Sequence, residues 1–178
     1  WKHVASGGWH AAASRHDAAP HGRLLCADGT VVGAPEDPRL FLHSSRPFVT
    51  FHAAAVNESQ KPRVIWLAAL DELAPQRDGC NKAVRLRAKG LPDHVSQKHW
   101  MPFEHRGVLY FVYTWSPLRV LRCTQWRQGM CEPVGAAAVP ASFMVSPASS
   151  LVVRGGTPLI EVAPDVFVAM CHTRLPCD

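Results

Sequence analysis

The chain has 178 residues, enough to bury a core as one domain, and its 47 % hydrophobic and 19 % charged residues exclude a disordered polypeptide. No window approaches 18 uninterrupted apolar residues, so the composition excludes a membrane-spanning helix of ordinary length. The net charge of +5 favours anionic ligands. Because the basic residues are scattered and no aromatic-basic ladder accompanies them, we expect no nucleic-acid partner.

The first residues carry no basic segment followed by an apolar run, and the chain starts at Trp1. We therefore expect that any signal segment lies outside this numbering and that the chain is a processed form or a fragment.

Short apolar runs between prolines and glycines predict strands joined by turns along most of the chain. The runs are rich in β-branched and aromatic residues and cover residues 48–52, 64–67, 108–113, 120–123, 150–153 and 166–170. Residues 68–84 and 129–149 lack strand alternation, so we expect them to form long surface connections.

A repeat connects these predicted strands. Polar residues, a proline and an apolar residue precede an aromatic strand three times, with the prolines at 38, 102 and 158. From Pro38 to His52 is 14 residues, and from Pro158 to His172 is also 14. A repeat with several strands per unit favours an all-β fold of the β-propeller type. The units are expected at 1–33 (partial), 34–90, 91–150 and 151–178 (partial), which makes the chain an incomplete portion of about three blades.

Loops at one rim of a propeller converge, so residues at equivalent places in successive blades meet in space. The repeat places acids, cations and imidazoles at matching places: Glu36, Asp37, Arg39 and His52 in one unit, Lys98 and His99 in the next, and Arg154, Thr157 and His172 in the last. We expect these side chains around one pocket. The alternative is a set of separate solvated charges on a rim.

Such a cluster suits glycosyl transfer. Making or cleaving a glycosidic bond requires a carboxylic acid at the bridging oxygen, and hydrolysis usually requires a second carboxylate to activate water. A phosphate acceptor is already a nucleophile and needs cations to hold it. One clear acid together with Arg39, Lys98, Arg154 and His172 fits the phosphate case better.

Three ordered segments between about residues 34 and 175 resemble motifs of one enzyme family. The segment "APEDPRLF" resembles the EDPR segment of glycoside hydrolase family 130, the β-mannoside phosphorylases, and of their eukaryotic mannosyltransferase relatives. The segments "QKHWMPF" with "GVLYFVYTWSPLRVL", and "RGGTPLIEV" with "VFVAMCHT", resemble two further motifs. His99 departs from the pattern, because the family commonly has Asn or Asp after the lysine.

The resemblance implies a five-bladed β-propeller enzyme with Asp37 as the general acid and Glu36 beside it. Arg39 would bind sugar hydroxyls or brace the acid, and Lys98 and His172 would contribute to a phosphate or donor-anion site. The implied partner is a mannoside-like carbohydrate. No cofactor is expected other than inorganic phosphate or a sugar-phosphate donor. Trp100 and Trp115 are expected in the core rather than stacked on sugar rings.

Six cysteines and one glycosylation sequon indicate a secretory route, in the Golgi lumen or outside the cell. Pairs 123–131 and 171–177 would close local loops, but the sequence does not choose among 15 connectivities. No CxxC pair or metal-binding histidine pair is present, so we expect no metal. The alternatives to an enzyme are a non-catalytic carbohydrate-binding or structural propeller, and a disulfide-tied extracellular interaction module.

Overall fold

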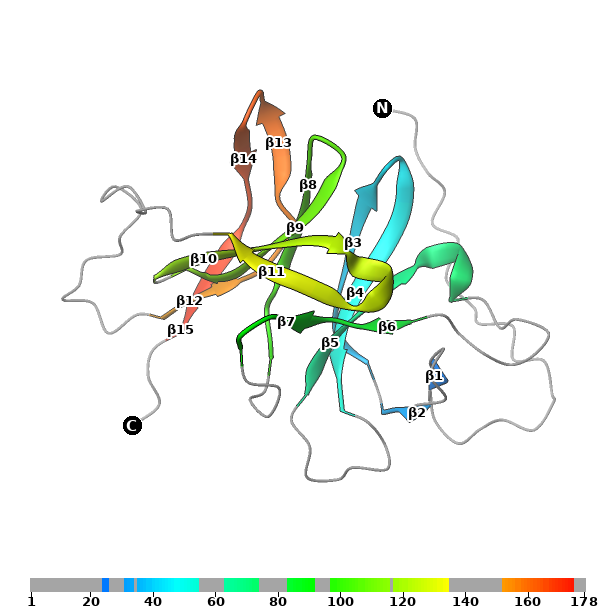
Figure 1. Ribbon diagram of the computed structural model, residues 1–178. Helices are drawn as coiled ribbons and strands as arrows, with labels where there is room; N and C mark the ends of the chain where they lie inside the picture. The colour runs from blue at the N-terminus through cyan, green and yellow to red at the C-terminus, as the bar shows by residue number, and fades with distance from the viewer. Residues whose placement is uncertain are drawn as a thin grey trace, which may run out of the picture.

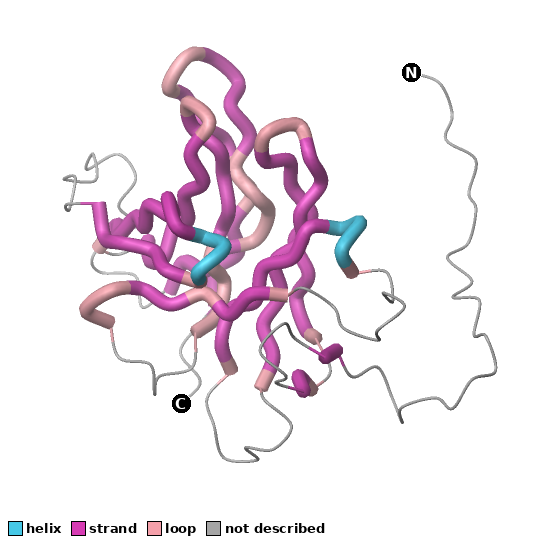
Figure 2. The backbone as a smooth tube through the Cα atoms, turned by 45° about the vertical axis from the view of Figure 1, so that its right-hand side comes forward, coloured by secondary structure: helices cyan, strands magenta, loops and turns pink. Residues whose placement is uncertain are grey.

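The computed structural model describes residues 24–25, 31–33, 35–54, 63–73, 83–91, 97–115, 117–134 and 152–174. These residues form strands and two short 3₁₀ turns and contain no α-helix, which confirms the all-β expectation (Figures 1 and 2). None of the helical turns in this part of the chain has the length and apolarity needed to cross a bilayer. The sequon at Asn57 lies outside the described residues.

The first large sheet is an antiparallel meander in the order β3-β4-β5-β6. Its strands are β3 (Glu36–His43), β4 (Arg46–Ala53), β5 (Val64–Ala69) and β6 (Val84–Arg85), and a 3₁₀ turn, Leu70–Glu72, follows β5. Ser44 and Ser45 join β3 to β4 with φ of 51° and 61°, the left-handed pair typical of a type I′ hairpin. A small ribbon of β1 (Leu24–Leu25) and β2 (Val31–Val32) precedes this sheet.

The second large sheet repeats the same meander. Strands β8 (Met101–His105), β9 (Val108–Trp115), β10 (Leu118–Gln125) and β11 (Met130–Val134) are antiparallel in sequence order, with a 3₁₀ turn at Trp126–Gln128. Strand β7 (Arg87–Ala88) follows β6 and pairs in parallel with β11, so the chain passes from one sheet to the outer edge of the next.

The last described strands form two pairs. Strand β12 (Val152–Gly155) pairs with β15 (Cys171–Arg174), and β13 (Ile160–Ala163) pairs with β14 (Val166–Val168). Strand β12 contacts β9, and β3 contacts β8, so the three units follow one another in space as they do in the chain. Figure 1 shows the β3–β4, β8–β9 and β13–β14 hairpins extending in the same direction.

The core lies between the two large sheets. Side chains of one face of the first sheet, including Phe41, Phe48 and Leu67, pack against Phe111 and Leu121 of the second. The opposite face of the first sheet buries Val49, Phe51 and Trp66 in a separate cluster. Every residue of β5 is buried because this strand is covered on both faces, which explains why its sequence is a continuous apolar run.

Each large sheet contains a strand, β6 in the first and β11 in the second, where the sequence analysis expected a connection. The expectation of a connection at residues 129–149 is wrong for Met130–Val134, which is strand β11, and the stretch 68–84 begins inside β5 and ends in β6. Only Cys131 of β11 is buried, so its sequence shows no apolar alternation.

The disulfide candidate Cys123–Cys131 is confirmed and joins β10 to β11 across a Cα–Cα distance of 4.2 Å. Among the described residues Cys171 is a free, exposed thiol, and Cys177 lies outside them.

Candidate functional site

The two ends of the sheets differ in what they carry. The hairpin end holds the turns at residues 44–45, 106–107 and 164–165. The opposite end, here called the charged end, comprises Glu36, Asp37, Arg39, His52, Arg63, Lys98, His99, Arg154 and His172. Contacts and electrostatic interactions connect these nine residues across all three units, and they include every acid, cation and imidazole that the sequence predicted for the site.

Asp37 sits on a bulge in β3. Glu36 pairs with His52 and Arg39 with Thr50, so β3 contains one residue more than β4 over this interval. Asp37 has φ of 49°, a left-handed conformation that Asp tolerates better than most residues. A bulge re-aims a side chain, and here the half-exposed Asp37 carboxylate lies at the open surface of the charged end.

Arg39 ties this bulge to the following units. Its buried guanidinium donates from Nε to the Gly156 carbonyl at 2.7 Å and from Nη2 to the Gly155 carbonyl at 3.3 Å. Nη2 also lies 3.3 Å from His99 Nδ1. Burial lowers the pKa of Arg39 and Asp37 opposes this effect. The guanidinium is thus occupied by protein acceptors, an arrangement that suits a brace.

Gly155 and Gly156 stand where other segments of the chain come very close to their backbone. A Cβ atom on Gly155 would lie 2.4 Å from the His99 carbonyl oxygen, and one on Gly156 would lie 2.4 Å from that of Met170. Both contacts are too short for any other residue, so Gly155 lets β12 approach His99 before β8, and Gly156 lets the chain approach Met170 before β15.

His99 also has a left-handed backbone, with φ of 62°. Its ring stacks edge-on against that of His172, with ring centroids 5.6 Å apart. Burial and then the Arg39 guanidinium lower the pKa of His99 to about 4, while Asp37 opposes the shift. A neutral His99 that accepts from Arg39 at Nδ1 carries its proton on Nε2.

The remaining cations surround this centre. Lys98 is exposed and lowers the pKa of His52, and the partly buried Arg154 lowers that of His99. Arg154 pairs directly with His172 across β12 and β15. The charged end therefore gathers cations from three successive units around His52 and His99, both of which also interact with the exposed Asp37.

Counting back from each hairpin turn shows which residues are equivalent. His43 precedes the first turn and His105 the second, and Asp37 and His99 each stand six positions before them. These two equivalent residues share the left-handed conformation. By the same count Pro38 matches Pro158 but Trp100 replaces it in the middle unit, so the sequence alignment of Pro102 with Pro38 was two residues out of register.

Sequence reasoning missed Arg63 and gave His52 no chemical role. His52, 2 % exposed, lies between the Glu36 and Asp37 carboxylates, and Arg63 pairs with Glu36. The equal spacing of Pro38–His52 and Pro158–His172 was the available signal for His52. Arg63 stands at the end of a segment outside the described residues, and its sequence neighbours gave no signal.

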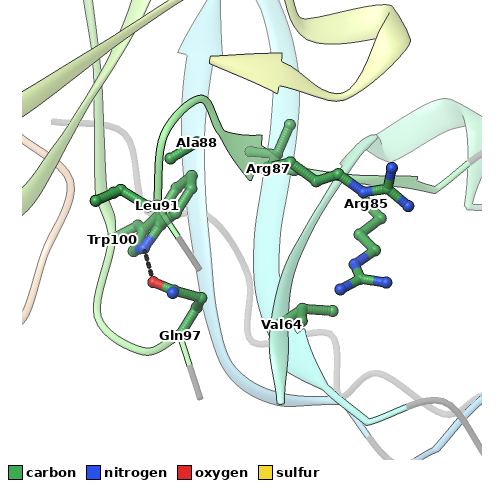
Figure 3. Close-up of a pocket in the computed structure, with 8 residues that line it drawn as sticks. Val64, Arg85, Arg87, Ala88, Leu91, Gln97 and Trp100 are labelled. Carbon is green, nitrogen blue, oxygen red and sulfur yellow. Dashed lines mark hydrogen bonds between the residues drawn. The ribbon is translucent and has the colours of Figure 1, made fainter. Parts of the chain in front are cut away.

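Trp100 is 1 % exposed and belongs to the core, as expected. Its ring N–H donates to Gln97 Oε1 at 3.2 Å beside a cavity of about 10 Å³ (Figure 3). Val64, Arg85 and Leu91 are among the residues that line this cavity. A volume of this size accommodates no more than a water molecule, so the cavity is not a sugar site.

At the hairpin end lies a cluster of potential metal ligands. One ligand atom each of His105, Glu161 and Asp165 falls within 4.8 Å of the others. Asp165 is already paired with Arg106 at 3.1 Å, and Glu161 accepts from the Asp165 backbone N–H. These contacts give the cluster a structural role in the β13–β14 hairpin.

The chain is similar in sequence to several yeast proteins named β-mannosyltransferases. The chain is 28 % identical to β-mannosyltransferase 3 of Komagataella phaffii over 155 residues, which cover 79 % of this chain and 23 % of that protein. β-Mannosyltransferase 2 of the same yeast is 27 % identical over 155 residues, 79 % of this chain and 22 % of its own length. β-Mannosyltransferase 8 of Candida albicans is 30 % identical over 110 residues, 54 % of this chain and 15 % of its own length.

The chain thus spans less than a quarter of the length of these relatives. No protein-family model and no solved structure matches it. These relatives share 27 to 30 % of their aligned residues with the chain.

Proposed function

We propose that this chain supplies part of the active site of a mannoside-active glycosyl-transfer enzyme, with Asp37 as the general acid. The observation that carries the proposal is the convergence of acid and cations from three units on Asp37, whose backbone is left-handed outside any turn. Residues held in sparsely populated backbone conformations cluster at functional sites. The relatives' names supply the sugar, mannose, and the reaction class, transfer.

The charge distribution favours phosphate chemistry over hydrolysis. Glu36 is engaged by Arg63, so Asp37 is the carboxylate available to a substrate at this end. In phosphorolysis a phosphate oxygen would attack the anomeric carbon, the glycosidic C–O bond would break, and the Asp37 proton would pass to the leaving oxygen. In the reverse, synthetic direction the Asp37 carboxylate would accept the proton of the acceptor hydroxyl as phosphate leaves.

Lys98, Arg154 and His172 would hold the phosphate of a sugar-phosphate donor or inorganic phosphate, because they supply positive charge beside the acid. Arg39 would brace Asp37, as its bonds to Gly155 and Gly156 support. His99 would present its Nε2–H as a neutral donor in place of the Asn or Asp of the resembling family.

The architecture we propose is a portion of a five-bladed propeller divided at residues 1–33, 34–90, 91–150 and 151–178. Two consecutive four-stranded meanders with a shared core support it. Apolar side chains exposed on the outer faces of the described sheets also support it, because further blades pack against such faces: Leu40 and Leu42 on β3, and Ile160, Val162, Val166 and Val168 on the β13–β14 hairpin. The Cys123–Cys131 disulfide supports an oxidising compartment such as the Golgi lumen or the exterior.

Asp37→Asn tests the proposal in the longest natural polypeptide that contains this chain. Mannose transfer from mannose 1-phosphate or a nucleotide-linked mannose to a mannoside acceptor should fall by about 10²-fold or more, with mannoside binding retained. Asp165→Asn, a change to an exposed aspartate at the hairpin end, should leave transfer unchanged. Mannoside binding by the wild type without turnover with either donor or with phosphate would instead support the non-catalytic carbohydrate-binding alternative.

A further inference from the structure

His52 is the most confined ionisable group of the charged end. It lies near the end of β4 with a side chain 1 % exposed, and both ring nitrogens are buried without a hydrogen bond among the described residues. Nε2 is 3.3 Å from Glu36 Oε2 and Nδ1 is 3.6 Å from Asp37 Oδ2. Both separations are within ion-pair reach, but the Nδ1–Oδ2 separation is too long for a hydrogen bond, and the Nε2–Oε2 contact is not a hydrogen bond in this structure either.

The charges facing this imidazole come from three segments. Asp37 and Glu36 of β3 raise the pKa of His52, Lys98 and Arg63 lower it, and burial has the largest effect and lowers it below 6.5. His52 is therefore a neutral ring at neutral pH. A neutral imidazole has one N–H donor and one lone pair, so it cannot donate to both carboxylates.

Arg63 decides between the two carboxylates. Its guanidinium donates to the same Glu36 oxygen that faces Nε2, so this oxygen serves as a hydrogen-bond acceptor at the end of the β3 bulge. The N–H of His52 is best placed on Nε2, toward Glu36. The Nδ1 lone pair then faces Asp37, where it repels a carboxylate oxygen and accepts from a carboxylic acid.

We propose that His52 is a positioning residue that holds the proton on Asp37, through an Arg63–Glu36–His52–Asp37 chain. The inference rests on the proposed function, because it gives the proton of Asp37 a use. During phosphorolysis the Asp37 O–H bond breaks as its proton passes to the glycosidic oxygen, and a proton from solvent later restores the acid. In synthesis the proton arriving from the acceptor hydroxyl is received in the same hydrogen bond. His52 stays neutral in both directions.

The first test reads the imidazole directly and needs no activity. In the ¹⁵N-histidine NMR spectrum of the wild type at pH 7, His52 should be neutral with its proton on Nε2. Asp37→Asn should move chiefly the Nδ1 signal and Glu36→Gln chiefly the Nε2 signal. A charged His52, or one with its proton on Nδ1, would overturn the proposal.

The second test reads the pH dependence of mannose transfer. In His52→Phe the ring volume remains but no lone pair faces Asp37, so the alkaline limb of the rate profile should move about one unit toward lower pH. His52→Gln, whose amide can donate to Glu36 and accept from Asp37, should restore the wild-type limb. A uniform loss of rate at every pH in His52→Phe, with no rescue by Gln, would show a structural role only.

The two tests distinguish failure of the proposed function from failure of the proposal for His52. Absence of transfer by the wild type would reject the proposed function, while the NMR spectrum would still decide the state of His52. If His52→Phe does not fold, the wild-type spectrum together with the Asp37→Asn and Glu36→Gln spectra decides whether the proposal stands.

Discussion

The hairpin end and the charged end use the same residue types in opposite ways. At the hairpin end His43 pairs with Glu104 at 2.6 Å and His105 with Asp165 at 3.4 Å, so equivalent histidines of successive units each contact a carboxylate of the next. At the charged end His52 faces two carboxylates and makes a hydrogen bond to neither.

Backbone conformation shows the same contrast. Ser44, Ser45, Arg106 and Asp165 are left-handed because tight turns require it. Asp37 is left-handed at the bulge in β3 and His99 in the segment before β8, so neither lies in a hairpin turn. Left-handed residues therefore form the turns at the hairpin end, whereas at the charged end they belong to the group of ionisable side chains.

The largest effect on stability is expected at Arg39. Arg39→Met removes the buried guanidinium and leaves the Gly155 and Gly156 carbonyls without its N–H groups, which should lower the free energy of unfolding by about 3 kcal/mol. Urea unfolding followed by tryptophan fluorescence measures this change. Arg106→Met, at an exposed arginine of the hairpin end, should cost less than about 0.5 kcal/mol. Equal losses in the two variants would remove the difference between the ends.

The disulfide should rank next. Replacing both Cys123 and Cys131 by Ser removes the disulfide near the hairpin end, which joins two residues separated by 8 positions in the sequence. The chain-entropy relation gives a loss of about 2.5 kcal/mol. Urea unfolding of the double variant and of the reduced wild type, each compared with the oxidised wild type, measures the loss, and the two values should agree. Mannose transfer by the surviving folded fraction should keep its pH profile, because no residue of the charged end is changed.

A smaller effect is expected at Glu104. Glu104→Ala leaves the buried His43 and the Ser44 backbone N–H without their acceptor, which should cost about 1 to 2 kcal/mol. Glu132→Ala is the matched control, because Glu132 pairs with Lys89 at an exposed site where ion pairs contribute about 0 to 1 kcal/mol. A large loss of transfer activity at native stability in Glu104→Ala would contradict the assignment of this end to structure.

The smallest effect concerns pH. The pKa of His99 is about 4 in the folded chain against 6.5 as its ordinary value, so between these values the unfolded chain binds more protons. The contribution of neutral His99 to the free energy of unfolding is therefore fully present above about pH 6.5 and is lost as the pH falls toward 4. The ring is partly exposed, so solvent weakens the effect.

His99→Asn should flatten this dependence, because Asn does not titrate and tolerates the left-handed backbone. The measurement is the urea midpoint at several pH values between 7 and 4.5. An unchanged slope in the variant would assign the pH dependence to other groups.

Features that depend on neighbouring residues could be predicted from the amino-acid sequence. Runs such as residues 48–52 and 108–113 predicted β4 and β9 because β-branched and aromatic residues favour strands locally. The Cys123–Cys131 pair was a candidate because its loop is short. The repeat placed Asp37, His99 and His172 at one end before any contact was known. Strands β6 and β11 escaped detection because they are short and bury few side chains.

The contacts within the charged end could not be predicted in this way and required the folded structure. The Arg39 bonds join residues separated by 116 and 117 positions, and sequence spacing contains no information about such geometry. The left-handed backbones of Asp37 and His99, and the burial of His52 between two carboxylates, arise where three units meet. Local sequence sets which strands form, but the balance of burial and charge on an ionisable group depends on every segment packed around it.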